Sequence, residues 1–247
     1  MERFAVIGDI HSNLEAFTAV LDDIKTQGVN DIFSLGDTVG YNADPEPCLD
    51  MVIDNSITSL RGNHDRYVAG SSEIEPNIKQ ATRHAVEYTR DILDKNHRML
   101  LNSFPDELNI GNSFLLVHGS PSHRDEYIIT SDSVVKNLKA MVQKYSGINI
   151  AFFGHSHMPM IAGNGKILRK FPENRAFKLE SDKVYLINPG SVGQPRDRVA
   201  LASYALFTPE LPAVEYRRIA YDIRTTQSKI VRAGLDQSIA ARLSGGL

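Results

Sequence analysis

Seven side chains that are common metal ligands come directly after short apolar runs. The runs and the motifs that follow them are FAVI then GDIHSN, IFSL then GDTVGY, ITSL then RGNHD, FLLV then HGS, and IAFF then GHSH. The ligand candidates in these motifs are Asp9, His11, Asp37, Asn63, His118, His155 and His157. In open α/β sheets, groups that follow the carboxyl ends of the strands converge in one crevice. We therefore expect these side chains to meet in space.

The residue types predict two divalent cations. Carboxylate, imidazole and amide donors without thiolate suit Mn²⁺, Fe²⁺, Zn²⁺ or Ni²⁺, of which we favour Mn²⁺. One ion would leave several of the seven ligands unused. Two carboxylates against two divalent ions leave a positive site, which attracts an anionic phosphate ester. Two such ions about 3.5–4 Å apart generate a nucleophile from water and clamp the oxygens of an in-line displacement at phosphorus.

A proton donor for the leaving group stands beside one of the ligand candidates. His64 follows Asn63 in the RGNHD motif and would reach the same site. Asp65 could hold the imidazole of His64 in the right tautomer and raise its basicity. The alternative for Asp65 is a capping role in a turn.

Residues outside the five motifs are candidates for substrate binding. Asn13 could contact substrate, although its place before a helix favours an N-cap. His123, Arg124 and Tyr127 follow the His118 motif and could line a pocket, or else lie in a solvated loop. Arg196 lies in the segment INPGSVGQPRD and could bind a phosphate bidentately, unless that segment is only a turn that enters a strand.

The hydrophobic pattern predicts alternating strands and helices in the first third of the chain. A strand at 4–7 is followed by a helix from residue 14 to Gly28, and a similar unit follows from residue 32 to 60. Alternating units of this kind favour a parallel sheet. Further along we expect one or two helices over 77–102, a hairpin over 107–117, a helix over 132–144, and then short, mostly antiparallel strands. The last helical stretch, 222–243, is interrupted at Gly234.

Composition narrows the class of protein. The 247 residues fit one domain, 1–247, and the net charge of −3 argues against an extended nucleic-acid-binding surface. The single cysteine, Cys48, cannot form an internal disulfide, and no apolar run is long enough for a membrane span. The first residues do not have the order of a signal peptide. We expect a soluble, cytoplasmic protein that acts on a small molecule and not at a membrane.

The five motifs, in their order along the chain, resemble the D-x-H, GD, GNH[DE], H and GHxH pattern of the calcineurin-like metallophosphoesterase superfamily. The segment INPGSVGQPRD is similar to the small bacterial and archaeal phosphodiesterase branch. The resemblance implies a four-layer α/β/β/α sandwich of two mixed β-sheets flanked by helices, in place of the simpler parallel sheet. It also implies that His64 is the general acid and that Asp37 bridges two metals. The implied ligand sets are Asp9, His11, Asp37 and His157 for one metal, and Asp37, Asn63, His118 and His155 for the other.

Two motifs depart from the pattern of the protein serine/threonine phosphatases. That branch reads GDxHG and GDxVDRG, whereas this chain reads GDIHSN and GDTVGY and lacks the phosphate-binding arginine of the second motif. The sequence therefore favours a phosphodiesterase that acts on a small phosphate ester or nucleotide by attack of a metal-bridging hydroxide. The alternatives are a dinucleoside polyphosphate hydrolase, a serine/threonine-type phosphoprotein phosphatase, and a catalytically weak metal-binding scaffold in a protein assembly.

Overall fold

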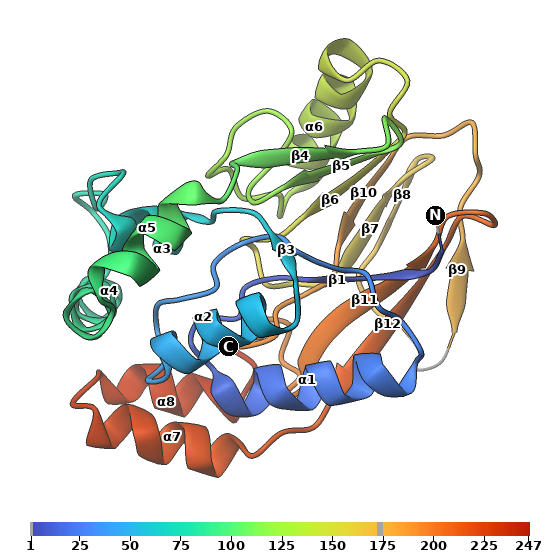
Figure 1. The fold of residues 1–247 in the computed structure, drawn as a ribbon. Helices are drawn as coiled ribbons and strands as arrows, with labels where there is room; N and C mark the ends of the chain where they lie inside the picture. The colour runs from blue at the N-terminus through green and yellow to red at the C-terminus, as the bar shows by residue number, and fades with distance from the viewer. Residues whose placement is uncertain (1, 172–174) are drawn as a thin grey trace.

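Two mixed β-sheets form the centre of the molecule in a computed structural model, which describes residues 2–171 and 175–247 (Figure 1). The strand order of the first sheet is β3 (Thr58–Ser59), β2 (Ile32–Ser34), β1 (Phe4–Ile7), β11 (Ala202–Thr208), β12 (Ala213–Ile219) and β9 (Ala176–Lys178). The order of the second is β4 (Glu107–Ile110), β5 (Phe114–Val117), β6 (Ile150–Phe153), β10 (Tyr185–Asn188), β7 (Met160–Gly163) and β8 (Lys166–Leu168). This confirms the sandwich implied by the resemblance.

Each sheet combines a parallel and an antiparallel part. Strands β1, β2 and β3 are parallel neighbours in the first sheet, and β5, β6 and β10 are parallel in the second. Strands β11, β12 and β9 extend the first sheet in antiparallel fashion. The parallel pairing predicted for the alternating units of the first third is confirmed by β1, β2 and β3, and the mostly antiparallel pairing predicted for the later strands is confirmed by hairpins such as β11 and β12.

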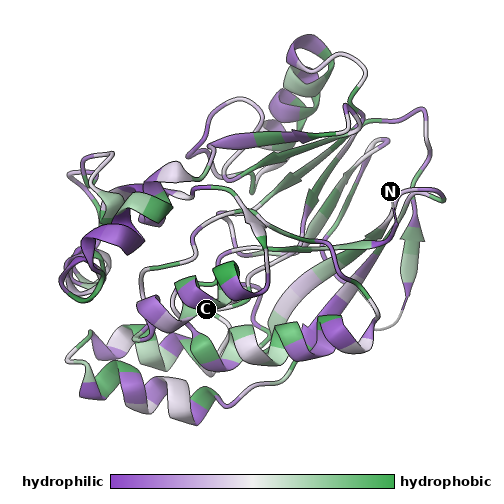
Figure 2. Ribbon diagram, viewed as in Figure 1, coloured by the Kyte–Doolittle hydropathy of each residue, from purple (hydrophilic) through white to green (hydrophobic). Residues whose placement is uncertain are grey.

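The main core lies between the two sheets. Phe4 and Val6 of β1 point into it, together with Phe152 of β6 and Phe207 of β11. Ala5 and Ile7 point to the other face and pack with helix α1. Alternate residues of a strand face opposite sides of the sheet, so a strand covered on both sides is apolar throughout. Figure 2 shows the apolar strands at the centre and polar residues toward the outer sides of the helices.

Helices cover the outer faces and one end of the sandwich (Figure 1). The helices are α1 (Leu14–Thr26), α2 (Pro45–Asp54), α3 (Asn63–Ala69), α4 (Gln80–Ile92), α5 (Lys95–Ser103), α6 (Ser131–Lys144), α7 (Ile223–Arg232) and α8 (Gln237–Leu243). Helices α1 and α2 pack on the first sheet, and α6 packs on the second. Helices α3, α4 and α5 pack on one another beside the sheets. Among the described residues, no helix combines the length and apolar character needed to cross a membrane.

The predicted interruption of the last helical stretch is confirmed. Helix α7 ends at Arg232 and α8 begins at Gln237. Between them Gly234 has a φ of +73°, in the left-handed region that glycine adopts without steric cost. The chain therefore turns at this glycine, and α7 and α8 pack against each other.

Candidate metal centre

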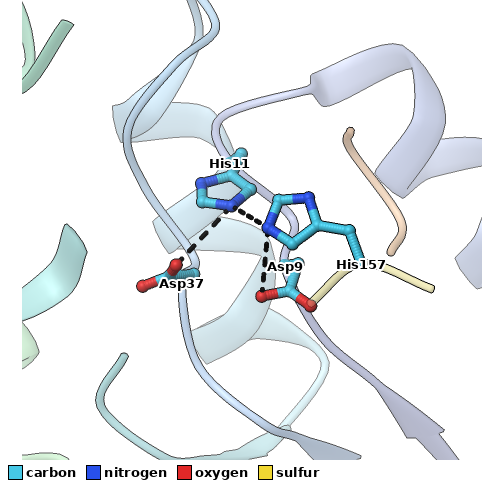
Figure 3. A group of neighbouring side chains, drawn as sticks. All are labelled: Asp9, His11, Asp37 and His157. Atoms are coloured by element: carbon cyan, nitrogen blue, oxygen red, sulfur yellow. Dashed lines mark hydrogen bonds and ion pairs between the residues drawn. The ribbon is translucent and has the colours of Figure 1, made fainter. Parts of the chain in front are cut away.

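The loops that follow β1, β2, β3, β5 and β6 meet at one edge of the sandwich and bring all seven ligand candidates together. Four of them, Asp9, His11, Asp37 and His157, offer ligand atoms within 4.8 Å of one another (Figure 3). Asp37, His118 and His155 form a second such group. Asn63 joins the second group, since its Oδ1 lies 3.0 Å from Nε2 of His118. Asp37 belongs to both groups.

The first group is compact and buried. Nε2 of His11 lies 3.1 Å from Nε2 of His157 and 3.5 Å from Oδ2 of Asp37. Nε2 of His157 lies 3.6 Å from Oδ1 of Asp9. Two imidazoles and two carboxylates thus point their ligand atoms toward one another (Figure 3).

The second group surrounds His118. Its Nε2 lies 3.4 Å from Oδ2 of Asp37 and 3.2 Å from Nδ1 of His155. The backbone N–H of His155 donates to the carboxylate of Asp9 at 3.1 Å, which ties this group to the first. The two groups therefore form one continuous polar cluster.

Backbone carbonyls fix the tautomers of three of the histidines. Nδ1 lies 3.2 Å from the carbonyl of Val39 for His11, 2.9 Å from that of Leu35 for His118, and 2.6 Å from that of Gln194 for His157. A carbonyl oxygen only accepts, so Nδ1 is the donor in each ring. In the neutral rings, Nε2 then presents a lone pair to the interior of the site, as in histidines that bind metals.

Burial and nearby charges shift the pKa values of the side chains in the site. Burial lowers the pKa values of His11, His155 and His157 well below the usual range, which keeps these rings neutral. Burial raises the pKa of Asp9 to about 7. Burial opposes a charge on His118 as well, but the carboxylate of Asp37 outweighs it and raises the pKa of His118 to about 9.

The lone pairs of His11 and His157 therefore face each other at 3.1 Å, between buried carboxylates. Two acceptors at this distance repel unless a positive charge lies between them. The donor set of oxygens and imidazole nitrogens suits a first-row divalent ion. The residues thus fit the cation that the sequence predicts.

Comparison with known proteins agrees with this geometry. The family model described as "Calcineurin-like phosphoesterase superfamily domain" matches residues 3–210. The chain belongs to this superfamily. The uncharacterized protein MJ0912 of Methanocaldococcus jannaschii is 37% identical over 243 residues, which cover 97% of this chain and 96% of that protein.

Solved structures extend the likeness to the whole fold of this phosphoesterase. The crystal structure of a metallophosphoesterase from Sphaerobacter thermophilus has a TM-score of 0.86 at 34% identity, over 100% of this chain and 99% of that chain. The hypothetical protein PH1004 from Pyrococcus horikoshii OT3 has a TM-score of 0.82 at 21% identity, over the same shares of the two chains. Membership of the superfamily makes this protein a metal-dependent phosphoesterase, a hydrolase of phosphate ester bonds.

Five of the seven ligand candidates sit in strained backbone conformations that sequence reasoning did not predict. Their φ angles are 53° for Asp9, 50° for His11, 53° for Asp37, 63° for His155 and 58° for His157. Left-handed conformations cost energy in residues with a Cβ, and they persist where surrounding bonds hold them. Here the backbone N–H groups of Asp9 and His11 donate to the carbonyls of Gly36 and Asp37 at 3.0 and 2.9 Å.

Two glycines leave room for side chains of the site. A Cβ on Gly62 would lie 2.1 Å from Oδ1 of Asp37, and a Cβ on Gly40 would lie 2.3 Å from Nδ1 of His64. No side chain larger than a hydrogen fits at these distances. Gly62 and Gly40 are therefore needed for close approach, and Gly40 also adopts a φ of +94° that favours glycine.

His64 lies at the site, but its partners differ from the prediction. Its ring centroid is 4.8 Å from that of His11, and its backbone N–H donates to Oδ1 of Asp37 at 2.8 Å. Burial lowers the pKa of His64 to about 4. The buried Nδ1 has no hydrogen-bond partner among the described residues.

Asp65 does not orient the imidazole of His64, contrary to one of the two roles predicted for it. Its carboxylate accepts from the backbone N–H of Gly62 at 2.9 Å and from that of Val39 at 3.2 Å. The first bond caps helix α3, and the second ties that helix to the loop after β2. Both carboxylate oxygens are thus engaged by backbone donors, and Asp65 fixes the loop that carries His64.

Three of the five candidate substrate contacts, Asn13, His123 and Arg124, lie away from the centre of the site. Asn13 is fully buried, accepts from the N–H of Ala16 at 3.1 Å as the N-cap of α1, and donates to the carbonyl of Gly193 at 2.9 Å. His123 accepts from the N–H of Asp125 in an exposed loop, and Arg124 is also exposed. These placements match the alternatives that the sequence left open, which were an N-cap for Asn13 and a solvated loop for His123 and Arg124.

Arg196 and Tyr127 are the exceptions: the ring of Tyr127 lies 3.9 Å from that of His155, and the backbone N–H of Arg196 donates to the carbonyl of His157 at 3.2 Å. Nη2 of Arg196 donates to Oε1 of Gln194 at 2.9 Å, and its guanidinium lies over the ring of Tyr41 at 5.8 Å from the centroid. Sequence reasoning missed Tyr41 and Gln194. Tyr41 ends the GDTVGY motif, so its place directly after a ligand motif was the signal that could have identified it.

Proposed function

We propose that this phosphoesterase hydrolyses a phosphodiester of a small molecule or nucleotide at two divalent metal ions, with Mn²⁺ as the favoured ion. The observation that carries the proposal is the sharing of Asp37 by two groups of buried ligand atoms. Asp9, His11, Asp37 and His157 would hold one ion. Asp37, Asn63, His118 and His155 would hold the other.

The ions, when bound, supply a nucleophile at neutral pH and positive charge at the phosphorus. The chain supplies orientation. The carbonyls of Val39, Leu35 and Gln194 hold the imidazoles of His11, His118 and His157 with Nε2 toward the interior of the site, where the ions would bind. The strained loops place the carboxylates without further movement, so the site is organised before substrate binds.

His64 is the proposed proton donor to the leaving group, and the negative charge of a bound phosphate ester would oppose the burial that lowers the pKa of its imidazole. Its ring lies beside that of His11, on the side of the cluster where Tyr41 borders a cavity. An alkoxide leaving group of a diester is a strong base, so protonation by a positioned imidazole speeds its departure. The absence of the arginine of the GDxVDRG motif supports a small ester over a phosphoprotein as substrate.

The first test measures the hydrolysis of bis(p-nitrophenyl) phosphate with added Mn²⁺. We expect Asp37→Asn to lose nearly all turnover, because the residue common to both groups loses its charge. We expect His64→Ala to lose about 10²- to 10⁴-fold in kcat on diesters whose leaving group is a poor one. The loss should be smaller with p-nitrophenolate, which departs without a proton.

A matched control is His84→Ala, since His84 is an exposed histidine of α4 far along the chain from the motifs. It should retain the activity of the natural protein. Undiminished turnover in both Asp37→Asn and His64→Ala would exclude the proposed mechanism. An equal loss for good and poor leaving groups in His64→Ala would exclude the role of His64 as acid.

A further inference from the structure

A cavity of about 360 Å³ adjoins the metal centre on the side of His64. Residues far apart in the sequence line it, among them Tyr41, Ile78, Lys79, Tyr127, Arg196 and Arg242. Pockets for small molecules range from about 300 to 1,000 Å³. This volume suits one compact group and not a polymer.

Two tyrosines connect the cavity to the centre. The ring of Tyr41 lies 4.5 Å from that of His64 and 4.7 Å from that of His11, measured between centroids. The ring of Tyr127 lies 3.9 Å from that of His155. Both rings therefore separate the site histidines from the cavity and line it as well. A group that leaves phosphorus toward His64 departs on the side of these tyrosines.

The cavity is also positively charged. Lys79, Arg196 and Arg242 line it, and no acidic side chain is among the described lining residues. Over residues 2–171 and 175–247, none of the three cations forms an ion pair within the molecule. Elsewhere an arginine such as Arg217 is paired with a carboxylate, at 2.9 Å from Asp23. Cations without a carboxylate partner around a cavity are suited to bind an anion of a ligand.

We propose that this cavity binds the leaving group of the substrate, and that the leaving group carries an aromatic ring and a second phosphate, as a nucleotide does. The tyrosines and Ile78 contact the ring, and Lys79 and Arg242 bind the second phosphate. This inference rests on the proposed function, because it assigns the side of departure from the position of His64. It deepens that function by naming the substrate class: a phosphodiester in which one ester group is a nucleotide.

The test uses calorimetric titration of the full chain loaded with Mn²⁺, with adenosine 5′-monophosphate as a mimic of the leaving group. The reference ligands are inorganic phosphate, which reports binding at the metals alone, and adenosine and ribose 5-phosphate, which each lack one feature. We expect adenosine 5′-monophosphate to bind at least about 10-fold more tightly than any of the three, since base stacking on an aromatic side chain and a charge-assisted phosphate contact each contribute about that factor.

Two variants distinguish binding of the phosphate from stacking of the base. Lys79→Ala combined with Arg242→Ala should remove most of the preference for adenosine 5′-monophosphate over adenosine, and Tyr127→Ala should remove most of its preference over ribose 5-phosphate. The matched control is Lys95→Ala combined with Arg232→Ala, an exposed lysine and arginine outside the cavity. It should keep both preferences.

The inference is overturned if adenosine 5′-monophosphate binds no more tightly than inorganic phosphate, or if the cavity variants keep the preferences of the natural protein. Turnover of bis(p-nitrophenyl) phosphate is measured in parallel. Turnover that depends on Asp37 together with failed preferences would remove only the nucleotide pocket. Loss of both would remove the proposed function as well.

Discussion

Two carboxylate clusters in this molecule, one partly buried around Asp23 and one buried around Asp37, differ in what satisfies their charge. In one, Asp23 of α1 accepts from the hydroxyl of Tyr204 in β11 at 2.6 Å and from Arg217 in β12 at 2.9 and 3.0 Å. In the metal centre, Oδ2 of Asp37 faces Nε2 atoms of His11 and His118 at 3.5 and 3.4 Å. The carboxylate of Asp23 is satisfied by a hydroxyl and a guanidinium, whereas that of Asp37 faces imidazole nitrogens that could share a metal ion with it.

The backbone conformations of the two aspartates also differ. Asp23 lies inside a regular helix, while Asp37 lies in a left-handed turn with a φ of 53°. Strain is tolerated where it places a ligand, and surrounding hydrogen bonds offset its cost. We infer that the Asp23 cluster, whose charges are paired within the protein, stabilises the fold. The Asp37 cluster, whose side chains could bind a metal ion, has a catalytic role.

Removal of metal should separate the two clusters most strongly. We expect a chelator to abolish hydrolysis and added Mn²⁺ to restore it. Since the ion binds only the folded chain, Mn²⁺ at 100 times its Kd should raise the free energy of unfolding by about 2.7 kcal/mol. Urea denaturation with and without Mn²⁺ measures this gain. Asp37→Asn should lose the gain and Asp23→Asn should keep it; the reverse pattern would show that the wrong cluster has been assigned to metal.

Gly40→Ala should damage catalysis more than stability. The new Cβ would lie 2.3 Å from Nδ1 of His64, so the imidazole must move. We expect kcat to fall about 10²-fold on diesters with poor leaving groups, the lower part of the range for general acid catalysis. Gly28→Ala is the matched control, because Gly28 has a similarly positive φ of +66° but open space around its Cβ position. Equal kcat values for the two variants would mean that Gly40 is needed only for its turn.

Asp23→Asn should lower the free energy of unfolding by about 1–3 kcal/mol and leave hydrolysis intact, because Arg217 loses a charged partner. Denaturation by urea in the presence of a chelator measures this change in the free energy of unfolding without a contribution from metal. A loss of activity at unchanged stability would place Asp23 in the catalytic machinery and contradict its structural role.

The difference in unfolding free energy between the natural protein and Asp23→Asn depends on pH. Burial acts to raise the pKa of Asp23, but hydrogen bonds from Arg217 and Tyr204 outweigh it and hold the pKa below its usual range. The stabilisation is therefore fully present above the unfolded pKa of about 3.9 and is lost as the pH falls through the lower folded pKa. The gap in unfolding free energy between the natural protein and Asp23→Asn should shrink below about pH 4. A gap that widens there would contradict the assignment.

The sequence by itself predicted the ligand candidates and their place at the ends of strands. Asp9, Asp37 and His118 follow apolar runs directly, and a run of this kind predicts a buried strand from local pattern alone. Helix limits such as the break at Gly234 were also readable, because caps and breakers act on their own neighbours.

Tertiary structure decided the rest, because contacts between distant residues leave no periodic signal in the sequence. It joined hairpins to the parallel strands to make two mixed sheets, and it assigned Asp65 and Asn13 to backbone caps. It also brought Tyr41, Tyr127 and Arg242 to one cavity although they lie in separate parts of the chain. The type of chemistry is thus a property of the motifs, while the shape and charge that select a substrate arise only when the chain folds.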